Sequence, residues 1–167
     1  IMSSRLSECF GFVQCEVNQI LADAGIEGKA EMMKKWYDGY HFGSVDVYCP
    51  WDVMCYVQKL MTDSNAQPDN FWKNTSDNAV IRSFIDYAGA SITKKFETLM
   101  DGGYIVQKVD ENLTYDYLHS SEENLWSMLY LTGYLTRLRD DEIGEALPED
   151  TVALKIPNRE IQELFVT

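Results

Sequence analysis

The spacing of apolar residues constrains this chain more than any other feature. After Pro50, apolar side chains follow at helical intervals, which is the pattern of one buried helix face: Val53, Tyr56, Val57 and Leu60. The same spacing predicts further helices over residues 14–24 and about 29–37, after Ser76, across Ile92–Leu99, behind a capping box from Ser120 to Glu123, and after Asn158. The chain is therefore expected to be largely helical.

Short β-rich runs come only after Gly102 and Gly103. They predict strands at residues 104–106, 113–115, 135–139 and 152–156, with the acidic loop 140–150 joining the last two. We expect a mainly α (α+β) fold, about half helix. It divides into a helical half, residues 1–102, and a winged-helix-like half with short strands, residues 103–167.

The net charge of the chain limits the classes of partner that it is expected to bind. It has 14 Lys and Arg against 27 Asp and Glu, a net charge of −13, so its surface repels phosphate. Direct binding to nucleic acid or to an anionic membrane is not expected. No apolar run approaches the roughly twenty residues of a membrane helix, and the first residues contain no signal-peptide core, which predicts a cytoplasmic protein. A start at Ile1 predicts a piece of a longer chain.

The four cysteines form two pairs, Cys9 with Cys15 and Cys49 with Cys55, each with five residues between. Structural zinc ligands usually stand closer together, and a spacing of six on a helix turns the second side chain away from the first. We therefore predict reduced, buried thiols and no metal site.

Motifs that carry chemistry are weak. The nearest string to a phosphate-binding loop, residues 25–30, is too short and lacks the hydroxyl residue after its lysine. The acidic run 140–142 is interpreted as a solvated hairpin tip. His41 and His119 lack the context of a catalytic base and are predicted to be surface or capped histidines. No catalytic residue is predicted, and this chain by itself is not expected to be an enzyme.

Residues 36–53 stand out by their alternation of aromatic residues and glycines. Gly39 and Gly43 permit turns with positive φ, and Pro50 starts a helix. Five aromatic rings are predicted to form one cluster: Tyr37, Tyr40, Phe42, Tyr48 and Trp51. From composition alone, such a cluster is most simply explained as a loop held onto a helical core.

Several motifs in order resemble a family of bacterial AAA-ATPase-like proteins whose chains usually end in a PD-(D/E)XK nuclease-like domain. The matching segments are residues 10–12, 36–40, 47–51, 71–76, 120–126, 132–136 and 154–160. They cover nearly the whole chain. Cys49 stands where the family usually has Asn.

The resemblance implies that this chain holds the helical lid and the winged-helix-like region of such a protein, without either catalytic centre. An N-terminal P-loop domain, with ATP and Mg²⁺ as cofactors, and a C-terminal nuclease-like domain are the implied neighbours. Tyr48, Pro50 and Trp51 would then contact adenine, and Asp38 would hold the loop or reach a cation beside the phosphates. Nucleotide contacts would favour a closed lid, and the winged half would transmit this closure.

An alternative is a protein interaction module that works without nucleotide. A DNA-binding winged helix needs a basic recognition helix, whereas residues 121–134 contain Glu122 and Glu123 and neither Lys nor Arg. This composition favours contact with protein over contact with DNA.

Overall fold

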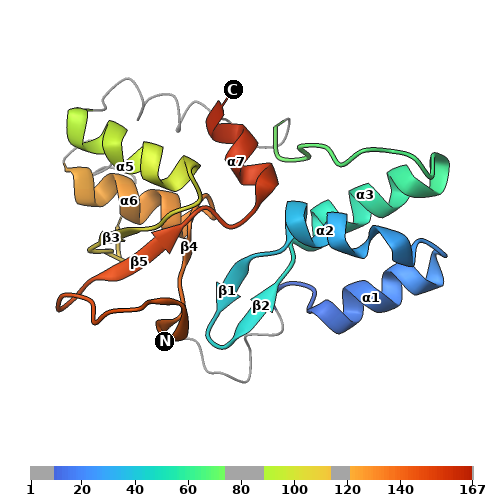
Figure 1. The fold of residues 1–167 in the computed structure, drawn as a ribbon, viewed down its shortest axis with the longest axis horizontal. Coiled ribbons are helices and arrows are strands. Elements are labelled where there is room, and N and C mark those ends of the chain that lie inside the picture. Colours follow the sequence, from blue (N-terminus) through green and yellow to red (C-terminus); the bar gives the residue numbers. More distant parts are fainter. Residues whose placement is uncertain (1–9, 74–88, 114–120, 167) are drawn as a thin grey trace. The chain divides into compact units, whose positions relative to one another are not determined.

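The computed structural model describes residues 10–73, 89–113 and 121–166 (Figure 1). Within these residues it has six α-helices and two small sheets, and it is 50% helical and 13% strand. The expected α+β class is confirmed. The helix expected after Ser76 lies outside the described residues. No helix among the described residues is long and apolar enough to cross a membrane.

Two compact units make up the chain. The first contains residues 1–76 and 158–167, and the second contains residues 77–157. This division differs from the expected halves, 1–102 and 103–167. Helix α5 (Ala90–Met100) belongs to the second unit because its apolar face packs there, with the Phe96 ring 5.1 Å from the Trp126 ring. Helix α7 (Arg159–Val166) returns to the first unit and packs against α2.

The helices of the first unit follow the predicted boundaries closely. They are α1 (Gln14–Asp23), α2 (Ala30–Tyr37), α3 (Pro50–Thr62) and α7, with a 3₁₀ turn, η2 (Glu27–Lys29), before α2. Gly25 adopts a φ of +69° just after α1, as predicted for a residue that ends a helix. Pro50 occupies the first position of α3, where its missing N–H costs nothing.

A short hairpin, which periodicity did not predict, joins α2 to α3. Its strands, β1 (Tyr40–Phe42) and β2 (Val45–Val47), are antiparallel and pair Tyr40 with Val47. Gly43 turns the chain with a φ of +61°. Phe12 bridges to Tyr48 beyond the hairpin, and this brings Gly11 so close that a Cβ there would lie 2.4 Å from the Tyr48 carbonyl oxygen.

The aromatic residues of segment 36–53 do not form the single cluster that was predicted. Tyr37 lies in the core of the first unit, with its ring 5.7 Å from Tyr56 and 5.8 Å from Phe71. Phe42 instead stacks on Phe10 at 5.4 Å. Trp51 is 58% exposed, because the first turn of α3 directs it away from the apolar face that Val53 and Tyr56 bury.

The second unit combines α5 and α6 (Glu122–Leu131) with a three-stranded antiparallel sheet (Figure 1). The sheet order is β3 (Ile105–Gln107), β5 (Val152–Lys155) and β4 (Thr136–Arg137), so the predicted hairpin of the last two strands is confirmed. Ser121, rather than Ser120, caps α6 through a hydrogen bond from the Asn124 amide. Leu113 is not in a strand, and residues 114–120 lie outside the described residues.

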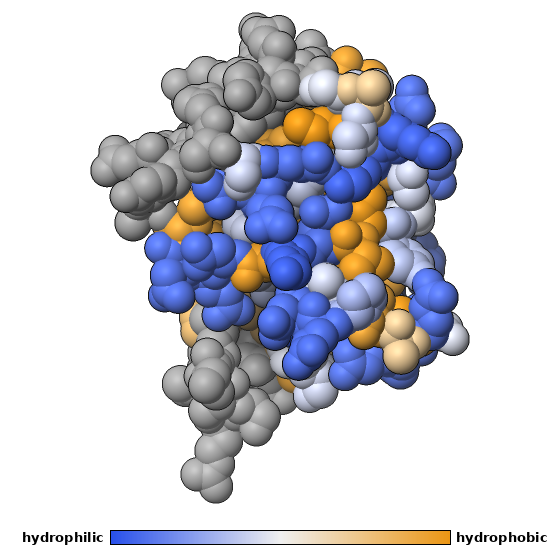
Figure 2. Space-filling view, turned by 90° about the vertical axis from the view of Figure 1, so that its left-hand side faces the viewer, coloured by the Kyte–Doolittle hydropathy of each residue, from blue (hydrophilic) through white to orange (hydrophobic). Residues whose placement is uncertain are grey.

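Figure 2 looks onto the side of the molecule on which α5 and α6 are drawn in Figure 1. Hydrophilic residues cover most of its described surface, and a narrower band of hydrophobic residues crosses it.

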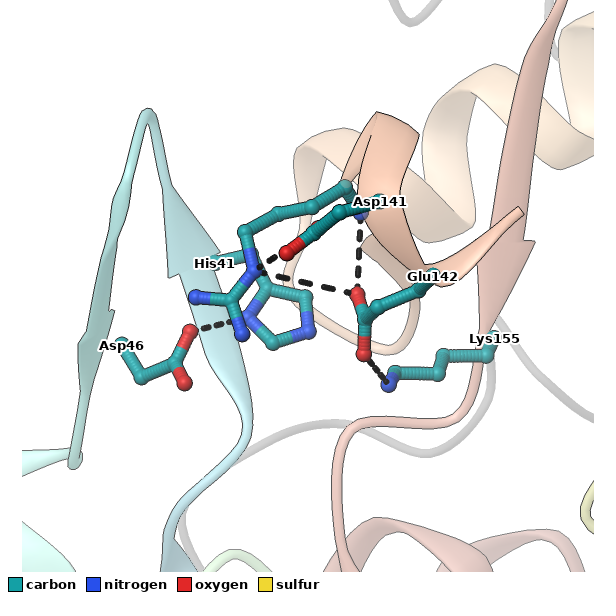
Figure 3. A network of polar contacts seen from close by, with 6 residues as sticks. His41, Asp46, Asp141, Glu142 and Lys155 are labelled. Carbon is teal, nitrogen blue, oxygen red and sulfur yellow. Dashed lines mark hydrogen bonds and ion pairs between the residues drawn. The ribbon is translucent and has the colours of Figure 1, made fainter. Parts of the chain in front are cut away.

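The acidic hairpin tip is part of the polar surface of this unit: Asp140, Asp141 and Glu142 form a 3₁₀ turn, η4 (Asp140–Glu142). Lys155 contacts Glu142 at 3.0 Å and Arg139 contacts Asp141 at 3.7 Å (Figure 3). The interpretation as a solvated tip agrees with these contacts.

Candidate functional site

The residues that the resemblance assigns to adenine lie around the start of α3. Tyr48 comes just before this helix and is buried, and its hydroxyl donates a hydrogen bond to Gln14 Oε1 at 2.9 Å. Pro50 and Trp51 form the exposed first turn. The structure thus places Tyr48 inside the first unit and leaves Pro50 and Trp51 at its surface.

Asp38, the fourth predicted site residue, ends α2 and is largely buried. Burial raises the pKa of its carboxyl, and the Gly39 amide that hydrogen-bonds to it acts in the opposite direction. The Oδ1 atom of Asp38 accepts no hydrogen bond from the described residues. The contact with the Gly39 amide places the Asp38 carboxyl in the turn that follows α2, and its roles towards a nucleotide or cation stay predictions.

The partner of the His41 side chain lies in the same hairpin. It stands opposite Asp46 in the register of β1 and β2, and its Nδ1 contacts Asp46 Oδ1 (Figure 3). This agrees with the prediction of a capped histidine. His119 lies outside the described residues.

The most unusual chemistry of the first unit is a pair of buried carboxyls, Asp52 in the first turn of α3 and Glu160 in the first turn of α7. Both residues are fully buried. Asp52 Oδ2 accepts a hydrogen bond from Trp72 Nε1 at 3.1 Å. Glu160 Oε1 accepts two, from the backbone amides of Phe71 at 2.6 Å and Trp72 at 3.2 Å. The side chains of Asp52 and Glu160 thus meet residues 71–72 at a fully buried site.

One shared proton would satisfy the remaining oxygen atoms of this pair of carboxyls. Asp52 Oδ1 and Glu160 Oε2 are buried and accept no hydrogen bond from the donors of the described residues. Burial raises the pKa of both carboxyls. The Asp52 charge and its interaction with Glu160 raise the pKa of Glu160 further, whereas Cys49, Glu160 and Trp72, in that order, act to lower the pKa of Asp52. Two adjacent buried carboxyls cannot both carry charge cheaply. The carboxyl of Glu160 therefore holds its proton to a higher pH than usual, and this proton is available to bridge to the Asp52 carboxylate.

The titratable neighbours of the pair add no positive charge. Tyr37 of α2, Cys49 just before α3 and Cys55 of α3 interact with it electrostatically. Burial and the adjacent Asp52 raise the pKa of the Cys49 thiol to about 12. Among the described residues neither carboxyl of the pair has an ion-pair partner, and no group of three or more His, Cys, Asp or Glu side chains is placed to hold a metal ion.

The structure agrees with the prediction that the cysteines are reduced, but only in part with the prediction that they are buried. Cys15, Cys49 and Cys55 are free thiols. The prediction that they are buried is wrong for Cys15, which is exposed on the polar side of α1, whereas Cys49 and Cys55 are half-buried. Cys9 lies outside the described residues.

Sequence reasoning did not select Asp52 or Glu160, although a signal was present. Asp52 precedes Tyr56 by one helical turn, and Glu160 precedes Leu164 by one turn, so each acid lies on the buried stripe of its helix. A carboxyl in such a stripe needs a specific partner.

Comparisons of the chain with protein-family models, with curated proteins and with solved structures found no match. The case for a function therefore depends on the residues and their geometry.

Proposed function

We propose that this chain is the lid and winged-helix-like region of an AAA-like ATPase, and that it couples the nucleotide state of a P-loop domain to neighbouring domains. In this proposal the chain carries neither catalytic centre. ATP and Mg²⁺ bind mainly to the P-loop domain that the resemblance implies, and a nuclease-like domain follows. The chain contributes a surface that covers the nucleotide.

The exposed Trp51 is the observation that carries this proposal. The Trp51 ring is 58% exposed on the first turn of α3, beside an exposed proline, so it can pack against a flat partner. Tyr48 holds this turn from inside through its hydrogen bond to Gln14. An exposed indole beside a proline is well suited to stack on a flat, apolar base such as adenine.

The order of elements in the second unit supports the winged-helix-like part. Helix α5, strand β3, helix α6 and the hairpin of β4 and β5 follow one another, with β5 between β3 and β4 in the sheet. This is the arrangement expected of a winged helix whose wing is the loop 138–151. The first turn of α6 carries Glu122 and Glu123, which favours a protein neighbour over DNA.

Trp51→Ala in the full-length protein tests the proposal. Base stacking on an aromatic side chain contributes about 1–3 kcal/mol, so the Kd for ATP should rise at least fivefold. Trp51→Phe should keep most of the affinity. Met61→Ala is the matched control, because Met61 is 71% exposed at the other end of α3 and should change nothing. Unchanged nucleotide affinity and turnover in Trp51→Ala would contradict the proposal.

A second candidate is a protein interaction module that needs no nucleotide. The observation that favours it is an apolar line along the exposed side of α3, formed by Trp51, Met54 and Met61. In that case Met54→Ala and Met61→Ala would weaken partner binding as much as Trp51→Ala, with or without ATP. A titration with duplex DNA at low salt separates both candidates from DNA binding, for which we expect no saturable signal.

A further inference from the structure

The chain passes between its two units twice, once after residue 76 and once after residue 157. Trp72 lies just before the first crossing, and Glu160 lies just after the second. Both belong to the first unit, where they contact each other directly through the Trp72 amide and the Glu160 carboxyl.

Glu160 binds the segment that leads to the first crossing, residues 70–73, at three points. Its Oε1 atom accepts the amides of Phe71 and Trp72, and its backbone carbonyl accepts a hydrogen bond from Asn70 Nδ2 at 3.0 Å. Asn70 Oδ1 in turn accepts the Lys73 amide at 2.9 Å. Residues 70–73 are therefore folded around one residue of α7.

Asn158 begins α7 at the second crossing. Its Oδ1 atom accepts the Ile161 amide at 3.1 Å and caps the helix. Ile161 and Leu164 bury the apolar face of this helix in the first unit. Glu160, in the first turn of this helix, is the residue that joins α7 to segment 70–73.

Asp52 connects this arrangement to α3. Its Oδ2 atom accepts a hydrogen bond from the Trp72 indole at 3.1 Å, and the carboxyl also interacts with the Cys49 thiol and with Glu160. Because both carboxyls are fully buried, water cannot replace this contact while the site stays closed.

We propose that Asp52 and Glu160 share one proton as a latch that fastens residues 70–73 and α7 to α3, and that removing this proton loosens residues 70–73 and α7 together. The latch does not depend on the nucleotide role proposed for Trp51. If that role holds as well, the neighbouring Trp51 places the nucleotide contact next to the latch in the sequence.

The surroundings determine how the latch responds to loss of its proton. Tyr37 of α2, Cys49 just before α3 and Cys55 of α3 interact with it electrostatically, and the Trp72 indole of segment 70–73 donates to it. The nearby cations Lys59 and Arg159 pair with Asp69 and Glu163 instead. Two negative charges would then repel each other in a site where no described cation pairs with either.

Hydrogen–deuterium exchange of the full chain at neutral pH tests the latch without nucleotide. Glu160→Ala should speed exchange at least tenfold both in residues 70–73 and in α7, and leave α5 unchanged. Glu160→Gln should keep the protection of both segments, because its amide oxygen accepts from residues 71 and 72 and its NH₂ group donates to Asp52. Glu163→Gln on the same helix is the matched control and should have no effect. Loosening of only one segment, or of neither, would overturn the proposal.

A second measurement covers the case in which Glu160→Ala fails to fold. Exchange of wild type and of Glu160→Gln is compared from about pH 6 to about pH 9.5, after correction for the intrinsic chemical exchange rate. Protection of both segments should fall with pH in wild type and stay level in Glu160→Gln. An equal pH dependence in the two proteins would overturn the latch and would leave the proposed nucleotide contact of Trp51 untouched.

Discussion

The Trp72 indole donates its Nε1 hydrogen to Asp52 Oδ2 across 3.1 Å, and so satisfies one oxygen of a fully buried carboxyl of another element. Trp72→Phe keeps a large ring but removes this donor. Leaving a buried acceptor without its partner costs about 1–3 kcal/mol, so urea denaturation should show a loss of stability in that range. Trp51→Phe is the control, because this exposed ring should change stability by less than about 0.5 kcal/mol. An equal effect of the two substitutions would contradict the role given to Trp72.

Stability should fall as the pH rises above about 5. The pKa of Glu160 is raised in the folded protein, so between its unfolded and folded values the folded chain holds a proton that the unfolded chain has lost. Removing that proton favours unfolding, with a slope of up to about 1.4 kcal/mol per pH unit. Urea denaturation between pH 5 and pH 9 measures it.

Glu160→Gln isolates this effect from all other titrating groups. The amide needs no proton to donate to Asp52, so the variant should become more stable than wild type as the pH rises. The quantity to compare is the difference in free energy of unfolding between the two proteins at each pH. A difference that stays constant would mean that Glu160 titrates alike in the folded and unfolded chain.

Gly11 is predicted to be intolerant of any side chain. A Cβ at this position would meet the Tyr48 carbonyl oxygen at 2.4 Å and Val47 Cβ at 3.0 Å. Because backbone and strand atoms cannot move aside easily, Gly11→Ala should lower the thermal midpoint by several degrees. Gly28→Ala is the matched control, since a Cβ there meets nothing within 4 Å. Similar midpoints for the two variants would show that the bridge between Phe12 and Tyr48 does not constrain the fold.

The free cysteines should react in a fixed order. Cys15 is exposed, whereas burial and the Asp52 charge raise the pKa of the Cys49 thiol to about 12. Since the thiolate is the nucleophile, labelling of Cys49 by a maleimide at pH 8 should be roughly a hundredfold slower or more than that of Cys15. Peptide mass mapping over time measures both rates. Fast labelling of Cys49 in the folded chain would contradict its placement beside Asp52.

Much of the fold could be predicted from local patterns. The helices α1, α2, α3 and α5 follow from apolar stripes bounded by Gly or Pro, because a helix buries one face at a fixed period. The hairpin of β1 and β2 was missed, since each strand has only three residues and too little alternation to separate it from a loop. Contacts between residues distant in sequence decide to which unit α5 and α7 belong. The periodicity of a single helix carries no information on such contacts.

The candidate site was predicted less completely. Pro50 was correctly predicted to start a helix. The spacing of residues does not predict that the Tyr48 side chain is buried while the Trp51 side chain is exposed. Asp52 and Glu160 are separated by more than half of the chain, and only the tertiary structure brings their carboxyls together. A carboxyl within an apolar stripe indicates that a partner exists, although the stripe does not identify the partner.

Carbon-13 NMR of the side-chain carboxyls, recorded across pH on the intact chain, tests the central claim most directly. The Glu160 carboxyl should keep its proton through neutral pH and titrate well above its ordinary range, and Asp52 should sense the same transition because the pair shares one proton. Glu163, on the same helix, provides an internal comparison. Titration of Glu160 near pH 4, independent of Asp52, would contradict the proton-sharing pair and the latch built on it.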